Sequence, residues 1–194
     1  MFQLSAYLIY IFICAYTPGP NNIMSMSNAI QVGFKKGVRF NLGVLTGFVI
    51  LMPLCAVFSG AIFRFIPQFE MYMYIAGAAY MLWLAWKIWN SKVDVEAHER
   101  KDMGFLTGIV VQFINPKLYI STISAMSVYV LPYYKEPLTL IGFALIQALM
   151  GFTGTIVWAL FGAALCGVLE KHSKLVNGVL ALLLIYCAVS LFIH

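Results

Sequence analysis

The segment Thr17-Pro18-Gly19-Pro20-Asn21-Asn22 interrupts a long uncharged run, residues 1–34. A proline has no backbone N–H and frees the carbonyl one turn before it, so two prolines around a glycine should unwind about one turn of helix. The hydroxyl and the two amides at the interruption also need hydrogen-bond partners if they are buried among apolar side chains. A simple kink would account for a lone proline such as Pro53. The clustered segment instead predicts a helix broken into two halves.

The composition of the whole chain is that of a protein embedded in a lipid bilayer. Of the 194 residues, 62% are hydrophobic and 10% are charged, and the mean hydropathy is +0.90. A soluble domain has about 45–50% apolar and about 25% charged residues, and one of this size could not bury so much apolar surface. Intrinsic disorder is excluded because it requires low hydrophobicity. The chain is predicted to be an all-α integral membrane protein.

Six apolar stretches between charged residues have the length of a membrane helix, which needs about 17–25 residues. The fourth stretch is interrupted only by Lys117, and the third is lengthened by interfacial tryptophans beside Lys87. The sequence therefore predicts six transmembrane helices. They fall in residues 1–34, 40–63, 71–86, 103–134, 138–169 and 175–194.

The basic residues indicate the orientation of these spans. Nine of the twelve Lys and Arg follow the first, third and fifth spans, whereas only Arg64 and Lys135 follow the second and fourth. Cytoplasmic loops carry the excess of Lys and Arg, so both termini are predicted to be extracytoplasmic. We interpret these charges as determinants of the membrane topology, and no nucleic-acid partner is predicted.

The hydrophilic segment 91–103 divides one membrane domain, residues 1–194, into two sets of three spans, about 1–90 and 104–194. Because each set has an odd number of spans, the second set must run inverted relative to the first. Inverted repeats with broken helices are a feature of transporters, whose substrate site lies near the midplane. Two similar strings, Gly43–Gly47 and Gly104–Gly108, lie in non-corresponding spans and are interpreted as independent small-residue packing faces.

The fourth span contains a second break, Asn115-Pro116-Lys117, in the helix that corresponds to the first. Lys117 follows 14 uncharged residues and precedes 17, so it should lie near the bilayer centre. An ionisable side chain there costs at least ~2.5 kcal/mol and indicates a functional site. The alternative is a lysine that caps carbonyls freed by Pro116. The predicted substrate-binding residues come from the two breaks. They are Thr17, Pro18, Gly19, Pro20, Asn21, Asn22, Asn115, Pro116 and Lys117.

The positions of the other polar residues exclude several functions. All seven acidic residues lie at span ends or in loops, and the three histidines lie in loops or at the terminus. The spans therefore lack a metal-ligand set and the acid–base pair of a membrane hydrolase, and no metal, no cofactor and no enzymatic activity is predicted. An unwound helix and a lysine can bind the carboxylate of a substrate. The spans have no carboxylate of their own to pair with the side-chain ammonium group of a dibasic substrate. The predicted substrate is a small neutral amino acid.

The two breaks, the six spans and the chain length resemble the LysE/RhtB amino-acid exporters over essentially the whole chain. The segments 76–88 and 180–189 are most similar to the cysteine/O-acetylserine exporter subgroup. This resemblance implies efflux of small amino acids or their derivatives from the cytoplasm across a bacterial inner membrane. It also implies drive by the proton motive force, in which Lys117 could exchange its proton against substrate.

Three alternatives remain open. Arg39 and Asn41, at the cytoplasmic start of the second span, form either a substrate entry or interfacial anchors. A transmembrane thiol–disulfide carrier of the cytochrome-c biogenesis type would need paired cysteines in the first and fourth spans, but only the first has one, Cys14. A non-transporting accessory membrane protein is the third possibility. The predicted partners are the substrate and the lipid bilayer, and no particular oligomer is predicted.

Overall fold

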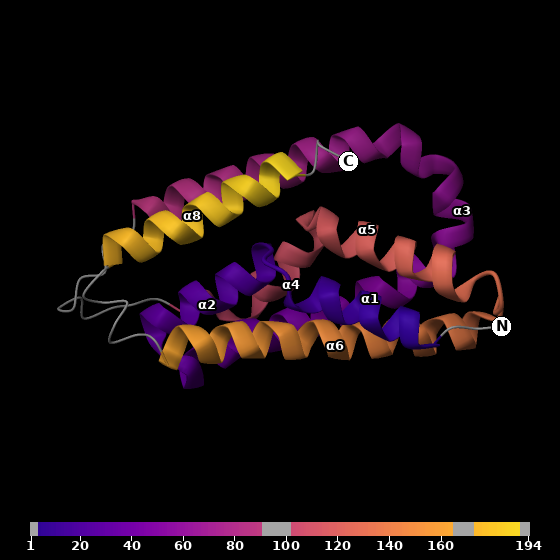
Figure 1. The fold of residues 1–194 in the computed structure, drawn as a ribbon, viewed down its shortest axis with the longest axis horizontal. Coiled ribbons are helices and arrows are strands. Elements are labelled where there is room, and N and C mark those ends of the chain that lie inside the picture. Colours follow the sequence, from indigo (N-terminus) through magenta and orange to yellow (C-terminus); the bar gives the residue numbers. More distant parts are fainter. Residues whose placement is uncertain (1–3, 91–101, 165–172, 191–194) are drawn as a thin grey trace.

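A computed structural model describes residues 4–90, 102–164 and 173–190, and every regular element in these ranges is a helix (Figure 1). The all-helical prediction is therefore confirmed for the described residues. The helices are α1 (Leu4–Tyr16), α2 (Pro20–Val32), α3 (Phe34–Trp89), α4 (Gly104–Ile114), α5 (Pro116–Ala125), the π-helix η1 (Met126–Val130), α6 (Pro137–Ala164) and α8 (Ser173–Ser190).

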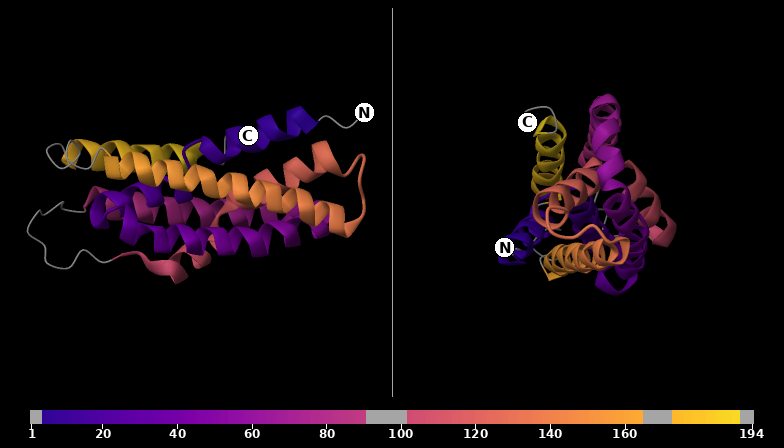
Figure 2. Two further views of the ribbon diagram at one scale, coloured as in Figure 1. Left: turned by 90° about the horizontal axis from the view of Figure 1, so that it is seen from below. Right: turned by 90° about the vertical axis from the view of Figure 1, so that its right-hand side faces the viewer.

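Both predicted helix breaks are present. α1 and α2 have 13 residues each and are separated at Thr17–Gly19, and α4 and α5, with 11 and 10 residues, are separated at Asn115. At about 1.5 Å per residue each half is about 15–20 Å long, roughly half of the ~30 Å hydrocarbon core. Neither half of a broken helix is therefore long enough to span such a core by itself. The two broken helices run in opposite directions through the bundle (Figures 1 and 2).

The second and third predicted spans differ from the expectation of two helices separated by a loop. The backbone is helical from Phe34 to Trp89, through the expected loop between residues 63 and 71. The ribbon bends back on itself along this length (Figure 1). Proline interrupts the helical hydrogen-bond ladder and permits kinks, and α3 contains Pro53 and Pro67. The first part of α3 packs in the main bundle and its last part runs beside α8 (Figure 1).

The core surrounds α2, which is the least apolar of the broken-helix halves. All residues of α2 from Pro20 to Ile30 are buried, among them Asn21, Asn22 and Asn28. A polar helix can occupy this position only where its side chains find partners, since no water is available there. α2 contacts α3, α6 and α8, and it lies inside the bundle rather than at its lipid-facing surface.

The two glycine strings pack against each other, which corrects the interpretation of independent faces. A Cβ at Gly43 of α3 would overlap the carbonyl of Phe105, and a Cβ at Gly108 of α4 would overlap the carbonyl of Phe40. A Cβ at Gly47 would overlap the side chain of Gln112. Small residues allow membrane helices to approach closely. One close contact between α3 and α4 therefore uses both strings.

The outer surface of the bundle is apolar. In α1 only Tyr7 and Ile11 are buried, whereas Ile9 is 60% exposed and Ile13 is 54% exposed. Exposed apolar surface of this extent suits contact with lipid. Within the described parts of the chain, two helical segments are long and apolar enough to cross a membrane by themselves, Phe34–Ser59 and Pro137–Ala164.

Candidate functional site

The break between α1 and α2 is held by hydrogen bonds to the carbonyls that the end of α1 leaves without helical partners. The Asn22 amide donates to the Ala15 carbonyl at 2.8 Å and to the Thr17 carbonyl at 2.9 Å. The Trp158 indole of α6 donates to the Tyr16 carbonyl at 3.1 Å. Helix ends inside a membrane require such partners. The break is thus a stable element of the fold with defined contacts.

Lys117 reaches this break from α5. Its Nζ donates to the Thr17 carbonyl at 3.1 Å, to the Thr17 Oγ1 at 3.0 Å and to the Pro18 carbonyl at 3.4 Å. The C-terminal end of a helix carries partial negative charge, so the end of α1 attracts the ammonium group. A Cβ at Gly19 would lie 3.1 Å from both Cδ and Nζ of Lys117. The absence of a side chain at Gly19 therefore leaves the space that Lys117 occupies.

The second break supplies partners for two of its own carbonyls, and the Lys117 ammonium group is not one of those partners. The Gln112 carbonyl accepts from the backbone N–H of Asn115, and the Phe113 carbonyl accepts from the Tyr119 hydroxyl at 3.2 Å. The Asn115 side chain caps the start of α5 by accepting from the Lys117 N–H at 3.1 Å. The hydrogen bonds of the Lys117 ammonium group go to the other break.

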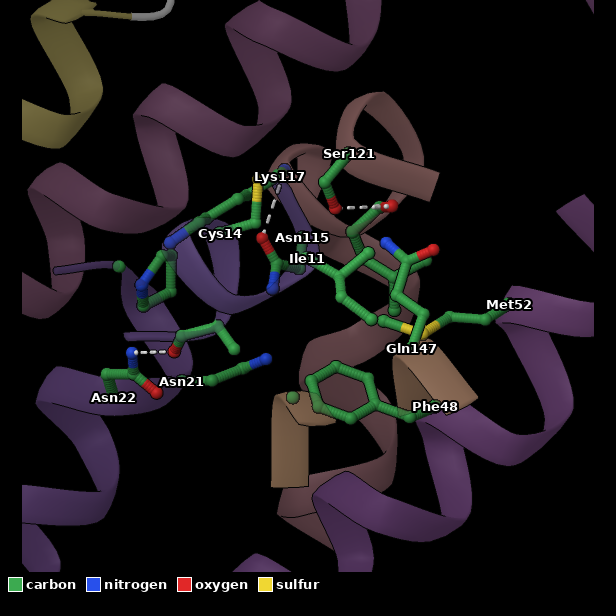
Figure 3. Close-up of a pocket in the computed structure, with 15 residues that line it drawn as sticks. Ile11, Cys14, Asn21, Asn22, Phe48, Met52, Asn115, Lys117, Ser121 and Gln147 are labelled. Atoms are coloured by element: carbon green, nitrogen blue, oxygen red, sulfur yellow. Dashed lines mark hydrogen bonds between the residues drawn. The ribbon is translucent and has the colours of Figure 1, made fainter. Parts of the chain in front are cut away.

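A cavity of about 50 Å³ lies where the two breaks meet (Figure 3). The N-terminal ends of α2 and α5 contribute to it, and both ends carry partial positive charge. α1, α3 and α6 supply the rest of the wall, which is largely apolar, and none of the lining residues is acidic. The cavity is lined by Ile11, Cys14, Ala15, Gly19, Pro20, Asn21, Asn22, Phe48, Met52, Asn115, Lys117, Leu118, Ser121, Gln147 and Gly151.

Most of the sequence-predicted site residues therefore lie together. Six of the nine line the cavity. Thr17 and Pro18 are exposed and contact the Lys117 ammonium group, and Pro116 is buried as the first residue of α5. The two candidate entry residues do not line it: Arg39 is exposed, and Asn41 is buried and accepts from Ser25 at 2.7 Å. Their role as an entry stays a prediction.

Two glutamines near the site were not predicted. Gln112 of α4 forms a reciprocal amide pair with Asn21, with donor–acceptor distances of 2.8 and 3.1 Å, and also donates to the Gly108 carbonyl. Gln147 of α6 lines the cavity. A single amide inside an apolar run was the available signal, since buried amides need partners.

Further along α2, a third amide connects it to the start of α4. Asn28 donates to Asp102 at 3.0 Å and accepts from the backbone N–H of Met103 at 3.2 Å. With the pair at Asn21, these contacts fasten α2 to α4 at both of its ends. Side-chain hydrogen bonds therefore connect α2 to α4 at two places beside the cavity.

None of the three cysteines among the described residues forms a disulfide. Cys14 lines the cavity, Cys55 is buried in α3, and Cys187 of α8 lies 3.7 Å from the Pro18 carbonyl. Cys166 and the hydrophilic segment at 91–101 lie outside the described residues.

Relatives that match nearly the whole chain carry the name of an amino-acid efflux protein. The chain is 38% identical over 189 residues to the cysteine/O-acetylserine efflux protein of Escherichia coli K12, which covers 97% of each chain. It is 36% identical over 191 residues to the protein of the same name from Klebsiella pneumoniae, covering 98% of this chain and 97% of the relative. No solved structure gives a significant match. The model of the LysE type translocators matches residues 12–194, and the chain belongs to this family of membrane proteins.

Proposed function

We propose that the protein exports small neutral amino acids or their derivatives, such as cysteine and O-acetylserine, from the cytoplasm. The observation that carries this proposal is the Lys117 ammonium group, 3.0 Å from Thr17 at a helix break beside a cavity. The names of the family and of the full-length relatives support export of an amino acid, and they indicate a transporter rather than an enzyme.

The chemistry of the cavity suits a small zwitterion. The ends of α2 and α5 and the Lys117 ammonium group offer positive charge to a substrate carboxylate. The lining residues include no carboxylate to pair with a second, side-chain ammonium group. The wall from α3 is apolar, and its Phe48 and Met52 would face a small side chain of the substrate. These features favour a neutral amino acid over a dibasic one.

The contacts of Lys117 suggest how binding leads to movement. In this structure the ammonium group bonds to carbonyls of Thr17 and Pro18 at the end of α1. A substrate carboxylate would compete with these carbonyls, because a charged acceptor forms a stronger hydrogen bond to an ammonium group. Binding would then weaken the contact that joins the two broken helices. We further propose that Lys117 exchanges a proton against substrate, which couples export to the proton motive force.

The proposed architecture is a multi-pass protein of the bacterial inner membrane with six spans in two inverted repeats. α1–α2 and α4–α5 run in opposite directions, as inverted repeats require (Figure 1). The nine-to-two distribution of basic residues favours cytoplasmic loops after the first, third and fifth spans and extracytoplasmic termini. Single cysteines at Lys35 and Glu136, in a cysteine-free background, should react with an impermeant maleimide from opposite sides. Reaction of position 35 from the periplasm would contradict the orientation.

Counterflow in proteoliposomes tests the transport proposal. Separate vesicles are loaded with unlabelled cysteine, O-acetylserine, serine or lysine. Those that contain cysteine or O-acetylserine should accumulate labelled cysteine from outside, and those that contain lysine should not. Vesicles with the Lys117→Met variant are the matched control for binding and leakage. Equal accumulation in these vesicles, or counterflow with lysine alone, would contradict the proposal.

Membership of the translocator family leaves the two alternatives from the sequence without support. The thiol–disulfide carrier would need a cysteine in the fourth span, and none occurs between residues 103 and 134. A non-transporting accessory role does not account for a lysine that is hydrogen-bonded to a helix break beside a cavity. Substrate-dependent counterflow separates both alternatives from export.

A further inference from the structure

Gln147 holds a hydrogen-bond acceptor that the fold leaves without a partner. The residue lies in α6, its side chain is 4% exposed, and its Oε1 has no hydrogen-bond partner. It also lines the cavity. Buried polar atoms are almost always paired, so an unpaired one at a cavity calls for an explanation. A binding site, where a few placed polar groups stand in an apolar wall, supplies one.

The neighbours of Gln147 in the cavity do not satisfy its Oε1. Phe48, Met52 and Ile11 are apolar and buried. Of the residues that line the cavity, Ser121 alone carries a hydroxyl, and this hydroxyl donates to the Leu118 carbonyl at 3.2 Å (Figure 3). The Oε1 atom is itself buried, but the amide ends a side-chain torsion that is broad and roughly two-fold. Rotation about this torsion presents the acceptor to a donor that enters the cavity.

The position of Gln147 relative to Lys117 indicates which donor this is. The two residues come from α6 and α5 and lie on opposite sides of the cavity (Figure 3). Lys117 and the ends of α2 and α5 provide positive charge on one side, and the amide oxygen provides a partial negative charge on the other. This polarity matches a molecule with a carboxylate and an ammonium group.

We propose that Gln147 Oε1 accepts a hydrogen bond from the α-ammonium group of the transported amino acid and thereby selects amino acids over the corresponding acids without the amino group. This assignment rests on the proposed export function. The ammonium group is the one strong donor that every neutral amino acid carries, and a hydrogen bond from a charged donor is roughly twice as strong as one between neutral groups. An amide in place of a carboxylate adds no negative charge to the cavity when it is empty.

Packing of α6 keeps this amide in place. Gly151 follows Gln147 by four residues, one turn along the same face of α6. A Cβ at Gly151 would lie 2.8 Å from the Phe48 ring. The absence of a side chain there lets α6 approach α3 closely, with Gln147 and Phe48 in the same cavity wall.

The test compares cysteine with 3-mercaptopropionate, which keeps the thiol and the carboxylate and lacks the amino group. Both compete against labelled cysteine in counterflow, and the concentration of each that halves the accumulation measures its affinity. Wild type should prefer cysteine by roughly 10- to 100-fold, the range for a hydrogen bond to a charged group. Gln147→Leu should lose most of this preference, and Gln147→Glu, which restores an acceptor, should retain it.

Thr122→Val is the matched control, since Thr122 Oγ1 is also buried and unpartnered but lies outside the cavity lining. Its preference should equal that of wild type. If Gln147→Leu fails to fold, Gln147→Met and the glutamate variant provide the comparison. A preference unchanged in the leucine or methionine variant would overturn the assignment and leave export intact. Failure of wild type to move or bind any amino acid would instead overturn the proposed function, and the assignment with it.

Discussion

The Lys117 Nζ lies 3.0 Å from the Thr17 Oγ1, although the two residues are 100 positions apart in the chain. This contact joins the two helix breaks and places a cationic side chain against the carbonyl end of α1. Neither break alone forms the site. Each contributes one partner, and the cavity beside them exists because both helices are interrupted at the same level of the bundle.

Replacing Lys117 with methionine should abolish transport while leaving the protein folded. Methionine retains the length of the side chain and removes a costly intramembrane charge. Loss of hydrogen bonds to a charged group, about 1.5–3 kcal/mol, corresponds to roughly a 10- to 100-fold fall in substrate affinity. Initial rates of cysteine counterflow and the thermal unfolding midpoint in detergent measure the two effects. Lys135→Met, at an exposed lysine, is the control and should transport normally.

The double variant Pro116→Ala with Lys117→Met separates a ligand from a helix cap. Regularising the fourth span cannot replace a lost ligand, so transport should not return. The structure gives a reason, because the carbonyls before Pro116 already accept from Asn115 and Tyr119. Robust efflux by the double variant, at normal expression, would remove Lys117 from the site.

The helix breaks could be predicted from sequence because proline in an apolar run is a local signal that tertiary structure seldom overrides. The meeting of Lys117 with the first break followed from its depth in the fourth span. Gln112 and Gln147 could not be singled out, since one amide in an apolar run has no periodicity to show which way it faces. Their positions depend on which helix each one meets.

The contact between the two glycine strings was missed for a related reason. A small-residue string shows that a helix can be approached closely, but it does not name the partner. The two strings lie in spans that do not correspond in the predicted repeat, so the repeat gives no reason to pair α3 with α4. The helical course of the segment between the second and third spans was not predicted, because charged residues within a helix and charged residues in a loop look alike in sequence. The helical backbone of α3 continues through Arg64 and Glu70.

Gly19→Ala should weaken transport through Lys117. The added Cβ would lie 3.1 Å from Lys117 Cδ and Nζ, and the lysine must shift to relieve the contact. Gly19 has an extended backbone, φ −175°, so alanine fits without backbone strain. Cysteine affinity in the counterflow assay should fall roughly 3- to 10-fold, with an unchanged unfolding midpoint. Gly142→Ala, in α6 with no atom within 4 Å of the new Cβ, is the control. Equal affinities in the two variants would show that Gly19 does not position the lysine.

Gly43→Ala should destabilise the contact between α3 and α4. The new Cβ would overlap the Phe105 carbonyl, which is backbone and cannot rotate away. Overpacking of this kind costs about 1–3 kcal/mol, and the unfolding midpoint in detergent should fall accordingly. Gly142→Ala serves again as the control and should be neutral or slightly stabilising. Full retention of the midpoint in Gly43→Ala would mean that the two helices separate more easily than their close contact implies.

The amide pair of Asn21 and Gln112 should show energetic coupling. Each single change to leucine leaves the other amide without its interhelical partner and should cost about 1–2 kcal/mol. The double change to leucine removes both amides, so it should cost less than the sum of the two single changes. Unfolding in a denaturing detergent measures all four proteins of the cycle. Thr46→Val provides the control, because the exposed Thr46 hydroxyl bonds only to the Leu42 carbonyl of its own helix. Strict additivity of the two leucine changes would show that α2 and α4 are held by packing alone, and that the polar contact at this end of α2 adds nothing to their association.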